Sequence, residues 1–290
     1  MVNPSKLADD EEAFRKSVGQ VMDDHGWDEP VWLETTPEDP GRGQAESAVS
    51  AGVDLVLACG GDGTVTACAE GVAGTGVPLA IIPMGTGNLL ARNMGLPMSA
   101  DEALAVALGG VQQPVDAGRV NGKLFVVMAG LGLDAQMLIG ASEPLKERLG
   151  WLAYAISAAR HLADRPMRVT ISADGGPPRK MLANTLVVGN VGWLRGGLLL
   201  LPDARPRDGR LDAVVLIARG LTGWLAAAAE IVLRRPPHGG IHRAQFTELR
   251  VTLDREQPWE LDGEVMGSTR QLTVVAQPGA LLLRMPPESA

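Results

Sequence analysis

Two short glycine-rich segments hold the residues best suited to chemistry. The first is Gly-Gly-Asp-Gly-Thr at 60–64, and the second is Pro-Met-Gly-Thr-Gly-Asn at 83–88. Such loops let backbone N–H groups approach an anion closely, and a helix N-terminus adds a partial positive charge. Each segment follows a short apolar run, Val53–Cys59 or Leu79–Ile82, and precedes a helix-like stretch. Two loops after successive strands predict a polyphosphate site at the carboxyl edge of a parallel sheet.

Asp62 separates the first loop from the familiar phosphate-binding motifs. Neither loop has the Gly-Lys-Ser/Thr of a P-loop or the G-x-G-x-x-G of a dinucleotide fold. A bare carboxylate inside a phosphate loop would repel phosphate. Asp62 therefore makes sense if a cation lies between them, or if Asp62 handles a proton. Either loop alone is equally well explained as a glycine turn of an α/β domain, but the pair favours phosphate binding.

Four aspartates outside the loops can also carry chemistry. Asp203, Asp208 and Asp212 lie in one polar segment around a glycine, where carboxylates and backbone carbonyls can hold Mg²⁺ together. Asp116 stands two residues before another glycine. Polar loops and turns ordinarily contain such residues as well. The residues alone leave both explanations open.

Glu264 is a further carboxylate, in the alternating segment Trp259–Val265. It directly follows Asp262-Gly263, and Asp-Gly is a strong signal for a hairpin turn. Taken by itself, the turn explains this segment better than a catalytic role does.

The two loops together resemble the diacylglycerol kinase catalytic domain family, which includes sphingosine and ceramide kinases. The segment at 60–64 alone also resembles NAD kinases and phosphofructokinases, whereas the segment at 83–88 points to the lipid kinases. The resemblance is strongest over residues 53–97 and looser over 114–135, 184–215 and 259–267. It implies that ATP and Mg²⁺ are the cofactors and that a lipid hydroxyl receives the phosphate.

The resemblance also implies roles for single residues. Glu264 matches the glutamate of an Asp-Gly-Glu segment and is the expected general base, because positioning outweighs base strength in a loose phosphoryl transfer. Asp62 is expected to order the metal and its waters, and it is also a candidate for the base. Nucleotide contacts are implied for a set of loop residues: Asn3, Gly60, Gly61, Gly63, Thr64, Gly85, Thr86 and Asn88.

A magnesium site is implied for Asp208, and Asp116 matches an aspartate linked to the same network. The sequence departs from the family pattern nearby, because Arg207 stands where some members have a second acid. In the second loop, Leu89 stands where an aspartate commonly follows the asparagine. These departures indicate an altered metal network, and they leave room for a member of the fold that has lost catalysis.

The apolar patterns predict an α/β domain over residues 1–114, with a doubly wound, mostly parallel sheet. Thr64 is the predicted cap of a helix Val65–Val72, and Asn88 of a helix Leu89–Met94. Further elements are predicted before and after the loops: helices at about 6–24, 43–51 and 102–108, and a short strand at 31–33.

An antiparallel, β-rich sandwich domain is predicted over residues 115–290. Asn121-Gly122 should form the tip of its first hairpin. Short strands are predicted at 167–173, 180–189, 210–217, 246–253, 257–261 and 271–276, and helices at about 144–164 and 221–235. The resemblance implies that the last apolar run, Leu281–Arg284, packs back on the first domain.

Charge is distributed unevenly along the 290 residues, which carry −8 in total. Residues 1–115 contain 5 Lys/Arg and 17 Asp/Glu, for a net −12, and residues 116–290 contain 21 and 17, for a net +4. Nucleotide binding in the acidic half must therefore rely on backbone dipoles and metal rather than on a basic field. We expect no nucleic-acid partner, and the sequence leaves a homodimer open.

A cytoplasmic location fits the remaining features. The N-terminus is acidic and lacks a signal-peptide core, and the longest apolar stretch, Leu221–Leu233, contains Glu230 and is shorter than the ~20 residues of a membrane span. Cys59 and Cys68 suit buried thiols in a reducing compartment.

The sequence therefore predicts a two-domain lipid kinase that phosphorylates diacylglycerol or a similar lipid alcohol. The alternatives are an NAD kinase-like enzyme with a soluble substrate and a non-catalytic lipid-binding or regulatory protein. A docking hypothesis follows from the +4 half: peripheral contact with the anionic inner face of the membrane, where tryptophan and basic residues are favoured. The alternative, which the sequence favours slightly, is that the tryptophans belong to the core and the basic residues are scattered over a solvated surface. The residues concerned are Trp151, Trp193, Trp224, Arg195, Arg234 and Arg235.

The N-terminus supports a separate expectation. In a doubly wound sheet the strand before Asn3 should be central, yet almost no residues precede it. A missing central strand would leave backbone groups of both neighbours unpaired. We therefore expect the natural chain to start earlier, by about five residues of strand length.

Overall fold

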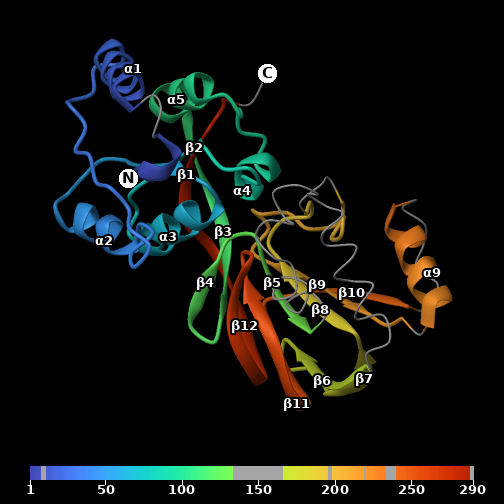
Figure 1. The fold of residues 1–290 in the computed structure, drawn as a ribbon. Helices are drawn as coiled ribbons and strands as arrows, with labels where there is room; N and C mark the ends of the chain where they lie inside the picture. Colours follow the sequence, from blue (N-terminus) through green and yellow to red (C-terminus); the bar gives the residue numbers. More distant parts are fainter. Residues whose placement is uncertain (8–10, 133–165, 195–197, 219, 233–239, 288–290) are drawn as a thin grey trace. The chain divides into compact units, whose positions relative to one another are not determined.

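The computed structural model describes residues 1–7, 11–132, 166–194, 198–218, 220–232 and 240–287 (Figure 1). The chain divides into two units. The first contains Met1–Val115 and Gly279–Ala290, and the second contains Asp116–Pro278. The C-terminal residues therefore return to the first unit. The predicted fold class is confirmed, because an α/β unit with parallel strands is joined to an antiparallel β unit.

The sheet of the first unit is built from parallel strands. β1 (Val56–Gly60) pairs with β2 (Leu79–Pro83), and the end of β12 (Glu264–Met285) pairs with β2 through Leu283 and Leu79. Parallel strands buried on both faces read as continuous apolar runs, and every residue of β2 is buried. This is why the two apolar runs were recognisable as strands in the sequence.

The first three residues lie between β1 and the segment Leu33–Thr35. On one side, the Asn3 amide donates to the Cys59 carbonyl (3.1 Å). On the other, the Val2 amide donates to the Leu33 carbonyl (2.8 Å) and the Thr35 amide to the Val2 carbonyl (2.9 Å). Pairing thus begins two residues later than the strand predicted at 31–33, and Val31 is 76% exposed.

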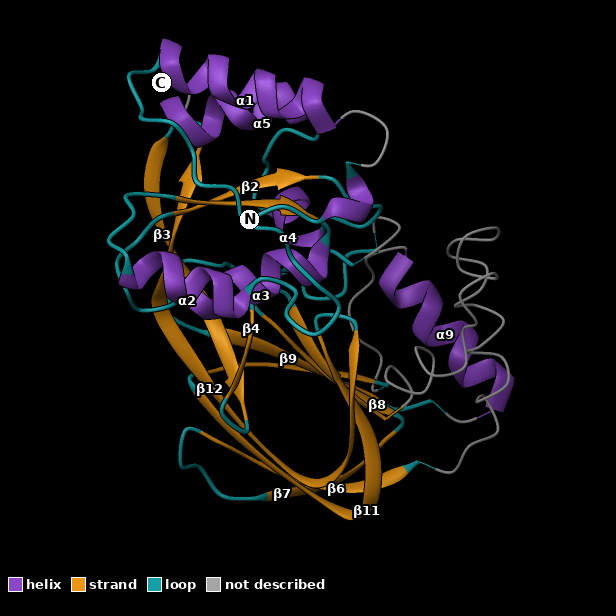
Figure 2. Ribbon diagram, turned by 60° about the vertical axis from the view of Figure 1, so that its left-hand side comes forward, coloured by secondary structure: helices purple, strands orange, loops and turns teal. Residues whose placement is uncertain are grey.

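Helices cover both faces of this sheet. Figure 2 shows α1 (Glu11–Asp24) and α5 (Ala100–Gly109) on one side of β2, and α2 (Arg42–Ser50) and α3 (Asp62–Val72) on the other. α1 and α5 share one apolar core with the strands, formed by residues such as Val18, Met22, Ile82, Leu104 and Leu108. The first unit also contains a short 3₁₀ helix at Pro4–Lys6 and α4 (Leu89–Asn93).

Of the two predicted helix caps, Thr64 is wrong, whereas Asn88 holds the N-cap position of α4 without a side-chain bond to the helix. α3 begins at Asp62, with an extended Gly61 as its N-cap, because an acid in the first turn interacts favourably with the helix dipole. Thr64 lies inside the helix and is buried. Asn88 does precede α4, but it adopts φ 47° and its side chain makes no bond to the helix.

The second unit is antiparallel, with neighbouring strands in the order β11, β5, β8, β9 and β10. β11 also pairs with β12 and β6, and β6 pairs with β7. The strands have the following bounds: β3 (Val111–Val120), β4 (Lys123–Phe125), β5 (Met128–Gly132), β6 (Met167–Ala173), β7 (Arg179–Ala183), β8 (Thr185–Gly189), β9 (Leu211–Leu216), β10 (Ile241–Phe246) and β11 (Glu248–Leu261).

The second unit largely follows the predicted pattern. Asn121-Gly122 forms the expected turn, with φ angles of 50° and 88°. The strand predicted at 180–189 is two strands, and the strands predicted at 246–253 and 257–261 form the single long β11. α9 runs from Gly220 to Val232. The helix predicted at 144–164 lies outside the described residues.

Among the described residues, no helix has the length and apolar character needed to cross a membrane. Two tryptophans of the docking hypothesis are described: Trp193 is 41% exposed, whereas Trp224 is partly buried and packs against Leu216, Ala218 and Ala227. The other four residues of that hypothesis lie outside the described part of the chain.

Candidate active site

The first glycine loop is shaped by the side chain of Thr64. A Cβ added at Gly60 would lie 2.7 Å from the Thr64 Cβ, so only glycine fits where β1 ends. The Thr64 side chain is buried beneath the loop. It therefore packs the loop from inside, whereas Gly63 is exposed and a Cβ there would meet no protein atom within 4 Å.

The two loops touch each other through their backbones. The Met84 amide donates to the Gly60 carbonyl (2.9 Å), which continues the pairing of β1 with β2 into the loops. A Cβ added at Gly85 would lie only 2.6 Å from the Gly61 Cα. Glycine at position 85 therefore permits a close approach of the two loops that a larger residue would not allow.

Asp62 fastens the second loop to the first. Its Oδ2 accepts the Asn88 amide at 3.0 Å, and its Oδ1 accepts the Leu89 amide at 2.5 Å. The Asp62 carboxylate thus accepts hydrogen bonds from amides at the start of α4, a role that we predicted for the side chain of Asn88.

Asn88 instead organises its own loop. Its Oδ1 accepts the Gly85 amide at 2.9 Å, and its Nδ2 donates to the Gly85 carbonyl at 2.7 Å. These two bonds close the turn Gly85–Asn88 and leave Thr86 exposed at its tip. Asn3 also reaches the carboxyl edge of β1, where its Oδ1 accepts bonds from the Ser5 amide (3.1 Å) and hydroxyl (2.8 Å).

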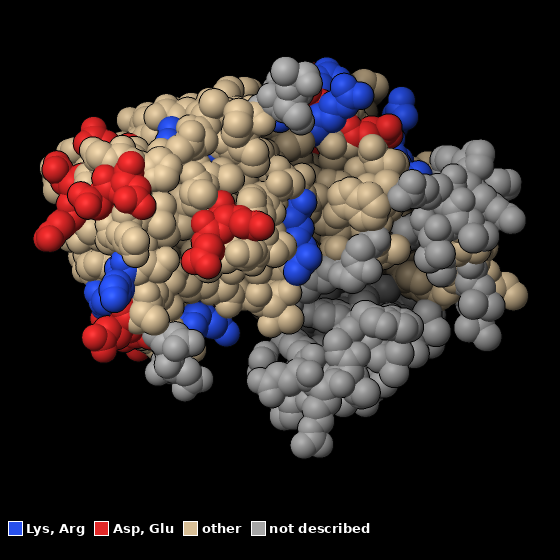
Figure 3. All heavy atoms as spheres, turned by 90° about the horizontal axis from the view of Figure 1, so that it is seen from above, with Lys and Arg blue, Asp and Glu red and all other residues tan. Residues whose placement is uncertain are grey.

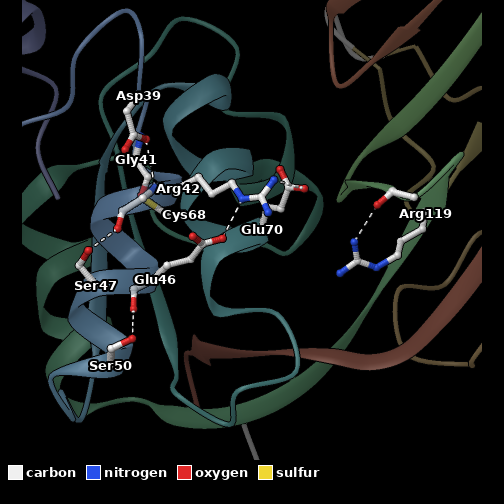
Figure 4. Close-up of polar contacts among 11 residues, drawn as sticks. Asp39, Gly41, Arg42, Glu46, Ser47, Ser50, Cys68, Glu70 and Arg119 are labelled. Carbon is white, nitrogen blue, oxygen red and sulfur yellow. Dashed lines mark hydrogen bonds and ion pairs between the residues drawn. The ribbon is translucent and has the colours of Figure 1, made fainter.

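The helix that follows the first loop is tied to its neighbour α2 (Figure 4). Arg42 of α2 bonds Glu46 at 2.8 Å and reaches Glu70 of α3 at 3.0 Å, and these two carboxylates raise the pKa of Arg42. Ahead of α2, the Asp39 carboxylate accepts the amides of Gly41 (3.0 Å) and Gly43 (3.2 Å). These contacts hold α3 in place without touching the loop itself.

The two cysteines near the loop are not nucleophiles. Cys59 lies in β1 and Cys68 in α3, and both are buried free thiols. Burial raises the pKa of Cys59 to about 11 and that of Cys68 to about 12. Since only the thiolate is a strong nucleophile, both side chains stay inert near neutral pH.

In the second unit, predicted site residues gather at one end of the sheet. Oδ2 of the buried Asp116 accepts the Gly209 amide at 2.7 Å, which brings Asp116 beside the Asp208 turn. The Asp208 Oδ1 accepts the Arg210 amide at 3.0 Å. Asn190, at the end of β8, donates from Nδ2 to the Asp116 carbonyl at 2.6 Å.

The Asp-Gly-Glu segment lies at the same end of this sheet. Asp262 and Gly263 form the turn between β11 and β12, with φ angles of 47° and 91°, and Glu264 is the exposed first residue of β12. Neighbouring strand β5 joins the two groups, since Met128 pairs with Gly189 while Ala129 pairs with Leu261. The structure thus brings Glu264, Asp116 and Asp208 to one edge of the second unit.

Two buried residues of this edge were not assigned to the site from the sequence: Asn190 was not named there, and Asp212 was named only as one of three aspartates in a polar segment. Asn190 is 1% exposed and follows a fully buried strand, and that position was the available signal. Asp212 is also buried, and burial raises the pKa of its carboxyl to about 6. The Gln245 amide lies 3.4 Å from the Asp212 Oδ2.

A magnesium ion fits this edge chemically but not as a complete protein cage. The carboxylates of Asp116 and Asp208 are the hard oxygen donors that Mg²⁺ prefers. In the described ranges, however, no three carboxylate, histidine or cysteine side chains are grouped closely enough to hold a metal. Mg²⁺ commonly keeps several waters and takes the rest of its ligands from substrate phosphates, so two carboxylates would suffice.

Charges on the visible surface occur in small separate groups. Figure 3 shows Asp and Glu side chains in clusters with isolated Lys and Arg side chains between them, and no broad basic area among the described residues on that face.

Comparison with known proteins decides the family. The model of the diacylglycerol kinase catalytic domain matches residues 1–120, and that of the YegS C-terminal NAD kinase beta sandwich-like domain matches residues 126–285. The chain belongs to this lipid kinase family. The predicted resemblance is therefore confirmed, and the matched ranges cover most of the chain.

Curated relatives of this lipid kinase match nearly end to end. The chain is 32% identical to the "Probable lipid kinase YegS-like" protein of Pseudomonas putida, covering 95% of this chain and 91% of the relative. It is 30% identical to the diacylglycerol kinase of Bacillus subtilis, covering 88% and 86%.

Solved structures agree with the fold. A diacylglycerol kinase from Bacillus anthracis shares a TM-score of 0.76 at 22% identity, with 100% of this chain and 96% of that chain covered. An NAD kinase from Archaeoglobus fulgidus in complex with ATP shares a TM-score of 0.54 at 12% identity, with coverage of 94% and 90%. The NAD kinase likeness is distant and concerns the fold alone.

Proposed function

We propose that this lipid kinase is an ATP- and Mg²⁺-dependent diacylglycerol kinase, which transfers the γ-phosphate of ATP to the lipid hydroxyl and forms phosphatidate. The observation that carries the proposal is the joined pair of glycine loops, in which Asp62 bonds both amides at the start of the second helix. Family membership supports the kinase class, and the diacylglycerol kinase of Bacillus subtilis supports the choice of acceptor.

The nucleotide phosphates would bind the loops of the first unit through backbone N–H groups. Gly63 and Thr86 are exposed on the two loops, and the space beside Gly63 is free of protein atoms. The proposed nucleotide-binding residues are Asn3, Gly60, Gly61, Gly63, Gly85, Thr86 and Asn88, with Thr64 packing the loop from beneath.

Glu264 would accept the proton of the lipid hydroxyl. As the hydroxyl oxygen bonds to the γ-phosphorus, its O–H proton passes to the Glu264 carboxylate. The bond from the γ-phosphorus to the bridging oxygen breaks, and that oxygen leaves with ADP. An exposed carboxylate suits this step, because the proton is lost late and the group needs correct placement more than high basicity.

Asp62, Asp116 and Asp208 would serve the metal. Bound Mg²⁺ supplies charge neutralisation for the transferring phosphoryl group. Asp62 would order the metal and its waters, and Asp116 and Asp208 would bind a cation at the edge of the second unit. Arg207 beside Asp208 leaves this second site with fewer acids than some relatives have.

A labelled-ATP assay on a lipid panel tests the proposal. We expect γ-labelled ATP to give an organic-extractable product that comigrates with phosphatidate when diacylglycerol is offered. Label in another lipid, such as a phosphorylated sphingoid base, would show that the acceptor is a different lipid while the phosphoryl transfer itself stands. Label in NADP alone would favour the soluble-substrate alternative, and no transfer at any Mg²⁺ concentration would favour a non-catalytic lipid-binding protein.

The proposed location is the cytoplasm, with peripheral contact at the inner membrane face where a lipid acceptor would be found. The two buried free thiols fit a reducing compartment. The exposed Trp193 is of the residue type that favours the membrane interface.

A further inference from the structure

The turn that carries Glu264 is fixed to the sheet by its own aspartate. The Asp262 Oδ2 accepts the Val126 amide at 2.9 Å, and its Oδ1 accepts the amides of Val127 (2.9 Å) and Met128 (2.8 Å). The Asp262 amide in turn donates to the Met128 carbonyl at 2.9 Å. Bonds to an ionised carboxylate are roughly twice as strong as neutral ones, so this turn is held firmly.

Turn formation alone does not require these bonds. Asn121-Gly122 makes the same kind of two-residue turn between β3 and β4, with nearly the same φ angles. Asparagine and glycine are as suitable as aspartate for such turns. The carboxylate at Asp262 therefore has a purpose beyond the turn.

The segment that Asp262 grips is itself immobilised from the other side. Asn190 donates its amide to the Val127 carbonyl at 3.0 Å and its Nδ2 to the Val126 carbonyl at 3.3 Å. Val126 is 1% exposed and Val127 is 2% exposed. Asp262 is thus bonded to a buried, fully paired piece of backbone, whereas Glu264 is exposed and depends on the turn for its position.

We propose that Asp262 is a positioning residue for phosphoryl transfer, which fixes the place of the Glu264 carboxylate through its three backbone bonds. This inference rests on the proposed function, in which Glu264 accepts the proton. A base must come within about 2.6–3.2 Å of the proton that it removes. A displacement of about 1 Å can cost roughly 100-fold in rate.

The test compares Asp262→Asn with a matched variant of the other turn. Asp262→Asn keeps the size and turn preference of the side chain but replaces one acceptor oxygen with an amide donor. We expect kcat to fall about 10- to 100-fold, with the KM for ATP within about twofold. Asn121→Gly removes side-chain bonds to the Thr273 amide and the Gln271 carbonyl, and it should lower Tm while leaving kcat unchanged.

A double variant separates positioning from general stability. On a Glu264→Gln background, Asp262→Asn should lower kcat by less than about twofold more, because both changes act on one proton transfer. Fully multiplied losses would overturn the inference, as would a wild-type kcat for Asp262→Asn when Glu264→Gln is slow. That second result would leave the proposed function standing. A wild-type kcat for Glu264→Gln would overturn this inference together with the role of Glu264 as the base, whereas the kinase reaction itself is tested separately by the labelled-ATP assay.

If Asp262→Asn does not accumulate as a folded protein, Asp262→Gly can be used in the same test. Glycine adopts the positive φ of this position without strain and supplies no acceptor. The same criteria apply to it: a kcat loss that vanishes on the Glu264→Gln background supports the inference, and a loss that persists there contradicts it.

Discussion

At the scale of single residues, two carboxylates divide the chemistry in the proposed mechanism. Both oxygens of Asp62 bond backbone amides of the second loop, whereas Glu264 is exposed at a turn. A carboxylate that holds the phosphate-binding backbone in place affects the binding of every ligand of that loop. A group that only removes a proton affects turnover.

Asp62→Asn and Glu264→Gln should therefore fail in different ways. Glu264→Gln should lower kcat by about 10²–10⁴ and leave nucleotide affinity nearly intact. Asp62→Asn places an amide donor against the amides of Asn88 and Leu89, and it should weaken both turnover and the Mg²⁺ dependence. Steady-state kinetics at varied Mg²⁺ decide between the roles. They are reversed if Glu264→Gln is nearly normal while Asp62→Asn is dead yet binds Mg·ATP normally.

Asp212 makes a separate prediction about pH. Burial raises the pKa of its carboxyl to about 6, so the folded state binds this proton more tightly than the unfolded chain. Its contribution to stability is fully present below the ordinary aspartate pKa and is lost as the pH rises through about 6. As the pH is raised from about 4.5 to about 7.5, the free energy of unfolding of Asp212→Asn should therefore increase relative to that of the wild type. Urea unfolding at these two pH values measures the difference.

Asp174 provides a control of opposite sign. Hydrogen bonds from the Glu248 amide and from Thr247 lower the pKa of its carboxyl. Its contribution is present above the ordinary aspartate pKa and is lost as the pH falls. Asp174→Asn should be less stable than the wild type at neutral pH, and this difference in the free energy of unfolding should disappear at low pH. Asp212→Asn should instead become more stable relative to the wild type as the pH rises. The same pH trend in both variants would contradict the assignment.

At the scale of elements, the two loops are in contact because β1 and β2 are neighbouring strands. Matched glycine variants separate packing from binding. Gly85→Ala places a Cβ against the Gly61 backbone and should lower Tm. Gly63→Ala meets no protein atom and replaces glycine within α3, so Tm should hold or rise, with a gain of up to about 1 kcal/mol.

The expected difference lies in ATP binding. If phosphate occupies the open space beside Gly63, Gly63→Ala should raise the KM for ATP about 10-fold or more despite its intact fold, because a methyl group would fill that space. Thermal unfolding and ATP titration on the same samples check both halves of the prediction. Wild-type ATP affinity in a stable Gly63→Ala variant would show that phosphate does not bind in the space beside Gly63.

The sequence predicted these elements better than their ends. Continuous apolar runs identified β1 and β2, because parallel strands are buried on both faces. The acceptor for the first amides of α4 was not predicted because it is distant in the sequence: Asp62 accepts bonds from amides 26 and 27 residues away, a contact that local preferences cannot reveal. The roles of Asn190 and Asp262 were hidden for the same reason, since both bind backbone that precedes β5.

At the scale of the whole molecule, the lipid kinase combines two units with different charge. The two units divide after Val115, and the change of rhythm in the sequence predicted a domain boundary after residue 114. The packing of Leu281–Arg284 back on the first domain was expected from the resemblance rather than from a sequence pattern. Arg284 fastens this segment there, with its guanidinium donating to the carbonyls of Ala107 and Leu108 at 2.7 Å each.

The most direct test of the central claim is the ratio of phosphatidate formed to ADP formed. Purified protein would be mixed with Mg·ATP and vesicles that contain diacylglycerol, and both products would be quantified in the same samples. The proposed reaction predicts a ratio near one that requires Mg²⁺, with both products lost together in Glu264→Gln. ADP without phosphatidate, or no ADP at all, would contradict a diacylglycerol kinase.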